Sequence, residues 1–280
     1  MPALRLFALT LAALLCFAAN SLLCRAALRP GLVDPATFTS VRLVSGALAL
    51  ALLLLAGRRG RPTGGSVGSA IALALYAVAF SFAYVRIGAG VGALLLFGAV
   101  QVTMVGWSAL GGARPTAAQA LGIAVALLGL AGLALPGASA PDTAGAALML
   151  AAGVAWGAYT LRGRKSGDPL AVNAHNFALS VPLALLFSAA LVGSARAAPE
   201  GIVLAVASGA VASGGGYSLW YAAVPALGAT RAAAVQLSVP VLAGLGATAF
   251  LGERLTWRIA AAGAAILGGI ALTLSRRSAP

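Results

Sequence analysis

The sequence predicts an all-α membrane protein in which ten transmembrane helices form two inverted five-helix repeats. Of its 280 residues, 61% are hydrophobic and only 8% are charged, whereas roughly 25% are charged in a typical soluble domain. The apolar residues form ten runs of about 20 residues, which is the length that crosses a bilayer core. A large soluble enzyme is excluded because this composition cannot cover an aqueous surface.

Glycine, proline and clusters of basic residues separate the ten predicted helices. The first run has the Arg5 charge, apolar core and small residues of a signal peptide, but the many apolar runs that follow favour a retained first helix. The separations at Arg86-Ile87-Gly88 and at Pro225 to Gly228 are the least marked. In chain order the predicted helices span 4–24, 35–56, 68–86, 89–110, 117–135, 144–161, 171–192, 201–223, 228–250 and 257–275.

The distribution of basic residues predicts the orientation. Cytoplasmic loops carry an excess of Lys and Arg. A cytoplasmic N-terminus puts eleven basic residues inside and six outside, with Arg42 omitted because it lies within the second predicted helix. We therefore expect a multi-pass protein of the cell inner membrane with both termini cytoplasmic. The inner set is Arg5, Arg58, Arg59, Arg61, Arg114, Arg162, Arg164, Lys165, Arg231, Arg276 and Arg277.

Weak internal similarity relates the two halves of the chain. Residues 17–25 (FAANSLLCR) resemble 156–164 (WGAYTLRGR), and 81–84 (SFAY) resemble 218–221 (SLWY). Because five helices per half is an odd number, the second half must enter the membrane upside down relative to the first. The predicted repeats are 1–136 and 137–280, and inverted repeats of this kind are typical of transporters.

The net charge of +13 does not indicate a nucleic-acid partner. The basic residues lie in short clusters between apolar runs, and no stretch combines them with stacking aromatic residues. Cys16 and Cys24 form no metal-site or disulfide pattern, and no phosphate loop or dinucleotide motif appears. We expect no metal and no cofactor. The expected partners are the lipid bilayer and a small-molecule substrate, for a chain that acts as a monomer or homodimer.

The most specific motif lies in residues 232–263, AAAVQLSVPVLAGLGATAFLGERLTWRIAAAG, which contain Pro240 and the turn Leu251-Gly252-Glu253. This segment resembles the signature of the EamA family in the drug/metabolite transporter superfamily. The segment around Asn20, followed by Arg42, is similar to the family's first two helices. The resemblance implies a ten-helix fold and the transport, often export, of amino acids and other small metabolites. The first half departs from the signature, since residues 111–116 (GGARPT) lack the glutamate.

The acidic residues bear on energy coupling. All five of them, Asp34, Asp142, Asp168, Glu200 and Glu253, fall in predicted loops or at helix ends. Carriers coupled to protons or cations usually need an ionisable carboxylate inside the membrane, so we expect a facilitator or exchanger. His175 is the other side chain that titrates near neutrality, and it is either a proton carrier or a hydrogen-bonded structural residue.

Three polar residues inside apolar runs are candidates for solute contact. Arg42 either extends toward the outer surface or contacts an anion such as a carboxylate. Pro240 lacks an amide hydrogen, so we expect the ninth helix to kink there and to free the carbonyl of Gln236. Gln101 lies in the corresponding region of the first half, and transporters tend to bind solute where broken helices meet near the midplane.

Aromatic side chains within the predicted helices complete the candidate site. Aromatic residues form only 6% of the chain, so those away from the interfaces are informative. With Asn20 and Asn176, they could line a cavity that is polar at some points and aromatic at others. The aromatic candidates are Tyr76, Tyr84, Trp156, Tyr159, Tyr217 and Trp220.

These observations favour a secondary transporter or facilitator that exports small metabolites, with aromatic or neutral amino acids as the first candidates. Another metabolite, such as a nucleoside or a drug-like compound, is the alternative within transport. An intramembrane enzyme is the alternative of another class, and it would need converging nucleophiles, acids or metal ligands.

Overall fold

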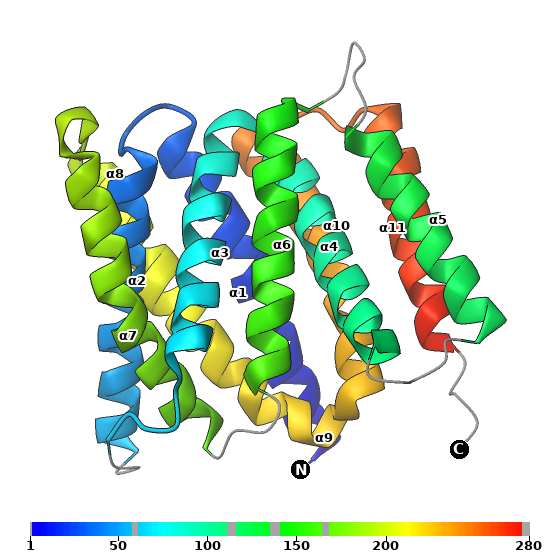
Figure 1. Cartoon of the computed structure of the whole chain (residues 1–280), viewed down its shortest axis with the longest axis horizontal. Helices are drawn as coiled ribbons and strands as arrows, with labels where there is room; N and C mark the ends of the chain where they lie inside the picture. Colours follow the sequence, from blue (N-terminus) through cyan, green and yellow to red (C-terminus); the bar gives the residue numbers. More distant parts are fainter. Residues whose placement is uncertain (1, 58–60, 111–115, 135–140, 164–167, 276–280) are drawn as a thin grey trace.

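The computed structural model describes residues 2–57, 61–110, 116–134, 141–163 and 168–275, which fold into helices joined by short connections (Figure 1). Within these residues no strand forms, although Val33 and Ala197 make an isolated β-bridge. The helices are α1 (Ala3–Leu28), α2 (Pro35–Ala56), α3 (Val67–Arg86), α4 (Ala89–Leu110), α5 (Ala117–Ala134), α6 (Thr143–Gly163), α7 (Pro169–Ala190), η1 (Val192–Ser194), α8 (Pro199–Val206), η2 (Ala207–Gly215), α9 (Gly216–Gln236), α10 (Ser238–Leu251) and α11 (Trp257–Ser275).

Long apolar helices dominate the described chain. Six segments are long and apolar enough to cross a membrane, namely 3–28, 35–56, 67–86, 143–163, 170–190 and 199–220. Four shorter apolar helices cover 89–104, 117–132, 238–251 and 257–272. The first seven predicted helices agree closely with α1 to α7.

The predicted break between the eighth and ninth helices is wrong. Residues 225–228 are helical, and α8, η2 and α9 follow one another without interruption from Pro199 to Gln236. The break comes at Leu237, so residues 228–236 belong to α9 rather than to the next helix. Proline and glycine mark helix ends in water-soluble proteins, but a membrane helix tolerates them because neighbouring groups satisfy the freed backbone.

Pro240 therefore does not kink the middle of a helix. It is the third residue of α10, where the amide hydrogen that proline lacks would have no intrahelical acceptor. The expected interruption of the helix near this residue is real, but it lies between Gln236 and Ser238. Gln236 thus ends α9 beside a turn.

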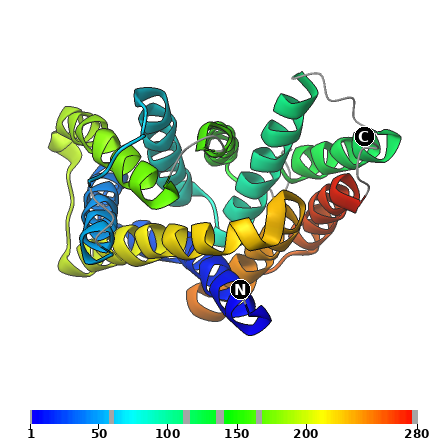
Figure 2. The same ribbon diagram turned by 90° about the horizontal axis from the view of Figure 1, so that it is seen from below.

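The helices run between two ends of the molecule. α1 begins and α11 ends at the same end, which is the lower one in Figure 1. Viewed from that end, α9 crosses the bundle toward α10, while α5 and α11 stand together at one side (Figure 2). α2 packs on α7, α4 on α10 and α5 on α11. α6 packs on α3 and α4, whereas α1 packs on η2, α9 and α10.

Asp34 fixes the connection between α1 and α2. Its carboxylate accepts hydrogen bonds from the amides of Ala36 and Thr37, and so caps α2. The second carboxylate oxygen accepts from the amide of Arg196, in the connection before α8. Burial raises the pKa of Asp34, but the hydrogen bonds from Thr37, Arg196 and Ala36 outweigh it, so the pKa is lowered overall.

Glycine allows α2 and η2 to approach closely. A Cβ atom on Gly209 would collide with the Arg42 carbonyl oxygen and with Ser45 Oγ. On the facing surface of α2, a Cβ on Gly46 would lie 3.2 Å from the Gly209 carbonyl oxygen. Small residues at helix contacts permit this approach in membranes, and here it sets the position of α2 against the π-helical stretch.

We expect the substitution Gly209→Ala to destabilise the protein by about 1–3 kcal/mol, the usual cost of overpacking. Thermal unfolding of the purified protein measures the effect. Gly244→Ala in α10 is the matched control, because no atom lies within 4 Å of its added Cβ. Equal melting temperatures for the two variants would contradict the assigned contact between α2 and η2.

Candidate functional site

A cavity lies at the centre of the bundle. The space between its atoms is about 410 Å³ when open solvent at its mouth is included, but its free interior is only about 30 Å³. Aromatic and aliphatic side chains form most of its wall, and a few polar groups interrupt them, as in many small-molecule sites. The lining residues come from α1, α3, α4, α6, η2 and α9, and they are Phe17, Asn20, Ser21, Tyr76, Phe80, Leu96, Phe97, Trp156, Ala212, Ser213, Tyr217 and Gln236.

The Tyr76 hydroxyl is the centre of the polar network at this cavity. It accepts a 3.0 Å hydrogen bond from Arg42 Nη2 and a 3.4 Å hydrogen bond from Asn20 Nδ2. Asn20 Oδ1 in turn accepts a 2.6 Å bond from Ser208 Oγ in η2. These contacts join α1, α2, α3 and η2 at one point within the apolar bundle.

Arg42 lies directly behind the wall formed by Tyr76 and Ser213. Its side chain is only 2% exposed, and its Nε donates to Ser213 Oγ at 3.4 Å. The guanidinium carbon lies 4.9 Å from the ring centre of Phe80 and 5.2 Å from that of Tyr76, so both ring faces attract the cation. The Nη1 nitrogen is buried without a hydrogen-bond partner. The expectation that Arg42 reaches the surface is therefore wrong in this structure.

Trp156 forms the aromatic side of the cavity. Its ring centre lies 4.9 Å from that of Tyr76 and 5.1 Å from that of Tyr217. Tyr159, one helical turn away on α6, stacks on the same indole at 5.4 Å. Phe17 from α1 closes the group with an edge-on contact to Tyr217.

The structure brings together only part of the set of residues predicted from sequence. Asn20, Tyr76, Trp156, Tyr217 and Gln236 line the cavity, and Arg42 contacts its wall. The others lie outside the lining. Tyr84 and Gln101 are buried elsewhere, and Tyr159 and Trp220 pack behind lining aromatic residues. His175 and Asn176 form hydrogen bonds with a connecting segment.

His175 and Asn176 hold the segment that precedes α3. His175 Nδ1 accepts from the amide of Gly65, and Asn176 Oδ1 accepts from the amide of Ser66. The Asn176 amide also donates to Tyr159 Oη, which donates to Asn173 Oδ1. These groups satisfy backbone amides at a helix start, which favours the hydrogen-bonded structural role of His175.

Sequence reasoning missed several cavity residues. Ser213 lines the cavity from η2, and Phe17 and Phe80 line it from α1 and α3. Ser208, also in η2, donates a hydrogen bond to the lining residue Asn20. Single serine and phenylalanine residues are common packing residues in membrane helices, so their types gave no signal. The structure shows that Ser213 lies in the π-helical stretch η2, and such stretches often occur at functional sites.

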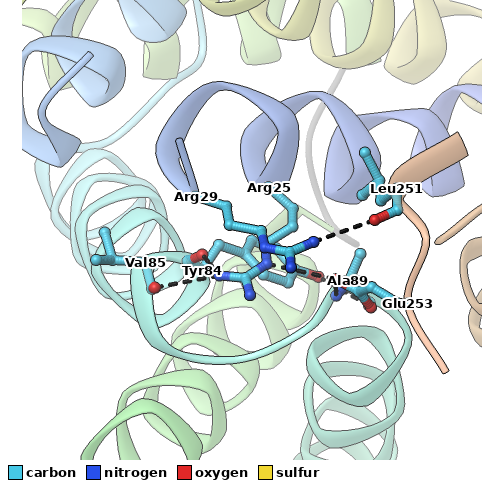
Figure 3. Close-up of polar contacts among 7 residues, drawn as sticks. All are labelled: Arg25, Arg29, Tyr84, Val85, Ala89, Leu251 and Glu253. Carbon is cyan, nitrogen blue, oxygen red and sulfur yellow. Dashed lines mark hydrogen bonds and ion pairs between the residues drawn. The ribbon is translucent and has the colours of Figure 1, made fainter. Parts of the chain in front are cut away.

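A second polar network, the Arg25 lock, joins four helix ends near the cavity (Figure 3). It consists of Arg25, Arg29 and Glu253 with the backbone groups that they bind. Arg25 Nε contacts Glu253 Oε1 at 3.3 Å, and Arg25 Nη1 donates to the carbonyls of Tyr84 and Val85. The same Glu253 oxygen accepts from the amide of Ala89 at 3.0 Å.

The lock uses backbone groups that a helix leaves unpaired. Tyr84 and Val85 lie in the last turn of α3, whose carbonyls favour a cation, and Ala89 begins α4, whose amides favour an anion. Arg29 Nη1 likewise donates to Leu251 O at the end of α10. Arg25 lies five residues beyond the cavity residue Asn20 on α1, or about 7.5 Å along the helix axis.

Gly252 aims Glu253 into the lock. Its φ angle of 63° is left-handed, and its place directly after α10 is the usual one for a glycine that ends a helix. In the Leu251-Gly252-Glu253 turn the glycine thus reverses the chain, and the glutamate carboxylate then accepts hydrogen bonds from the Arg25 side chain and the Ala89 amide.

Comparisons with known proteins agree with this architecture. A sequence model described as the EamA-like transporter family matches residues 143–275. The chain is 53% identical over 278 residues to the uncharacterized protein PA1977 of Pseudomonas aeruginosa, and the match covers 99% of this chain and 97% of that protein. A solved crystal structure resembles the fold with a TM-score of 0.66 and 20% sequence identity, covering 93% of this chain and 94% of its own.

We expect Glu253→Gln to open the lock. Cys24 directly precedes Arg25 in the chain and is fully buried. In a Cys16→Ser background, a polar maleimide should label Cys24 about tenfold faster in Glu253→Gln than in the parent. The reason is that a hydrogen bond between charged groups is worth about 1.5–3 kcal/mol. Asp142→Asn is the matched control at the same end, because it removes the exposed Arg86–Asp142 pair, which contributes little. Unchanged labelling in Glu253→Gln, or an equal increase in the control, would show that the Glu253 contacts do not limit access to Cys24.

Proposed function

Because this chain is a multi-pass membrane protein that belongs to the EamA-like transporter family of the drug/metabolite transporter superfamily, we propose that it carries a small organic solute through the central cavity. The observation that supports this most directly is the cavity itself. Six helical segments surround it, and its wall combines aromatic faces with isolated hydrogen-bonding groups. Such a wall suits a partly apolar solute that needs a few directed contacts.

Two inverted halves, 1–136 and 137–280, would give this cavity alternating access. The packing supports the proposal, because equivalent helices of the two halves pack on each other: α2 on α7, α4 on α10 and α5 on α11. The contacts of α1 with η2, α9 and α10 likewise match those of α6 with α3 and α4. In transporters the exchange of two such conformations opens the site to each side in turn.

The acidic residues support a facilitator or exchanger rather than a proton-driven pump. All five lie among the described residues, and each is at a helix end or in a connection. Asp34 and Asp168 cap helices, while Asp142 and Glu253 pair with arginines. Carriers coupled to ions usually hold a carboxylate inside the membrane, and the cavity wall contains none.

Aromatic or neutral amino acids are the first substrate candidates, because Trp156, Tyr76 and Tyr217 offer faces on which a flat apolar group can lie. Nucleosides and drug-like compounds would use the same faces. The direction that we propose is export. The described residues contain no group of three or more His, Cys, Asp or Glu side chains that could hold a metal ion.

Reconstituted protein should move at least one solute from a panel of amino acids, nucleosides and sugars down its gradient, and a protonophore should not abolish the flux. Gln236→Leu should lower the rate several-fold, since one lost hydrogen bond is worth about 0.5–1.5 kcal/mol. Gln101→Leu is the control, because Gln101 is buried but lies outside the cavity lining. An unchanged rate in Gln236→Leu would remove that residue from the site.

The orientation that we propose is an inner-membrane protein with both termini cytoplasmic. Of the predicted inner residues, Arg5, Arg61 and Arg162 lie among the described residues at the end where α1 begins and α6 ends, and Arg231 lies within α9 rather than in a connection. The others, Arg58, Arg59, Arg114, Arg164, Lys165, Arg276 and Arg277, lie outside the described residues. A C-terminal fluorescent-protein fusion should fluoresce, and the matching alkaline phosphatase fusion should be inactive. An active phosphatase fusion would reverse the orientation.

A further inference from the structure

We propose that the solute in the central cavity is a small organic monoanion, namely a carboxylate with an apolar body and no ammonium group. Arg42 would balance its charge through the hydroxyls of Tyr76 and Ser213. This inference rests on the proposed transport function and specifies what the cavity carries. It disfavours the amino acids and nucleosides named above, because an amino acid brings an ammonium group and a nucleoside brings no charge, and it leaves drug-like compounds that carry a carboxylate.

The first argument is the uncompensated charge of Arg42. Its guanidinium remains protonated under all ordinary conditions, and its side chain is 2% exposed. No described carboxylate pairs with it, since all five acids of the chain lie at helix ends or in connections. A buried cation without a counter-ion carries a large desolvation cost, and an anion arriving in the adjacent cavity would lower that cost.

The second argument is the direction of the hydrogen bonds. Tyr76 Oη accepts from Arg42 Nη2 and from Asn20 Nδ2, and Ser213 Oγ accepts from Arg42 Nε. Each hydroxyl still has its own hydrogen, and neither donates to an acceptor within the described part of the chain. Both residues line the cavity. Two donors polarised by one cation therefore lie at a cavity whose lining includes no carboxylate.

The third argument concerns the rest of the wall. Beyond Tyr76 and Ser213 the lining is mainly aromatic and aliphatic, with Phe97, Trp156 and Tyr217 among its large members. An ammonium group would need a carboxylate or several carbonyl acceptors, and the same cation behind the wall would repel it. A carboxylate attached to an apolar or aromatic body satisfies the donors and leaves nothing charged against the apolar surface.

Three probes of nearly equal shape test this proposal. 3-Phenylpropionate has the carboxylate alone, L-phenylalanine adds the ammonium group, and 3-phenylpropionamide replaces the carboxylate by a neutral amide. Binding to the purified full-length protein can be followed by tryptophan fluorescence, because Trp156 lines the cavity. We expect 3-phenylpropionate to bind at least tenfold more tightly than the other two, the ratio expected for one charge-assisted hydrogen bond.

Variants separate a solute contact from a structural role. Tyr76→Phe keeps the ring and removes one donor, so carboxylate binding should weaken about tenfold. Arg42→Met should abolish the preference for the carboxylate, yet leave the melting temperature of the empty protein unchanged or raised, because an uncompensated buried charge is removed. Ser40→Ala is the control on α2: its hydroxyl contacts Ala184 O and Ser188 Oγ on α7, away from the cavity, and binding should stay at the parental level.

The charge of the solute also has an electrical signature. In proteoliposomes that contain no solute to exchange, net entry of 3-phenylpropionate above that of protein-free vesicles should respond to an imposed potassium diffusion potential, because each cycle without exchange moves one negative charge. Flux of L-phenylalanine would not respond.

Equal or tighter binding of L-phenylalanine or of the amide would overturn the proposal, as would a lower melting temperature of Arg42→Met with the carboxylate preference retained. Binding of none of the three probes would overturn it as well. The transport function would survive each of these results if another solute moves in the flux panel, and it would fail if none does.

Discussion

The hydrocarbon core of a membrane offers no hydrogen-bond partner, so each polar group there must be satisfied by the protein itself. The described structure follows this constraint closely. The charged pairs lie at helix ends, and they bind the backbone groups that helices leave free: Arg25 holds carbonyls at the end of α3, and Glu253 holds the first amide of α4. Two side chains thereby form the hydrogen bonds that these backbone groups at the helix ends would otherwise need from water.

Arg42 is the exception that gives the interior its chemistry. Two hydroxyls and two ring faces partly satisfy its guanidinium, and Nη1 remains without a partner. The position of the residue depends on glycine, because only the absence of a side chain at Gly209 lets η2 lie against the Arg42 backbone. The close contact also carries Ser213 and Ser208 to the polar centre of the cavity. The tight contact of α2 with η2 thus positions a site in which no described carboxylate balances the charge of Arg42.

Much of the fold could be predicted from the sequence, since the length and apolar character of a membrane helix are fixed by bilayer thickness. The error at Pro225 to Gly228 arose because residues that end helices in water do not end them in lipid. In the site, Asn20, Arg42, Tyr76 and Trp156 were identifiable because polar or aromatic groups are rare in these runs. His175 and Asn176 were of the same types, but they contact a connection. Which face of a helix a residue occupies is set by packing, which the sequence alone does not give.

The cavity and the Arg25 lock are built on the same three helices. α1 contributes Asn20 to one and Arg25 to the other, α3 contributes Tyr76 and then Tyr84, and α4 contributes Phe97 and Ala89. Between the two sites, Phe80 packs on Tyr84 with ring centres 4.6 Å apart and on the Arg42 guanidinium. Helices are stiff over these distances, and close-packed interiors transmit displacement. Phe80 therefore forms a direct packing connection between Tyr84 at the lock and the Arg42 guanidinium behind the cavity wall.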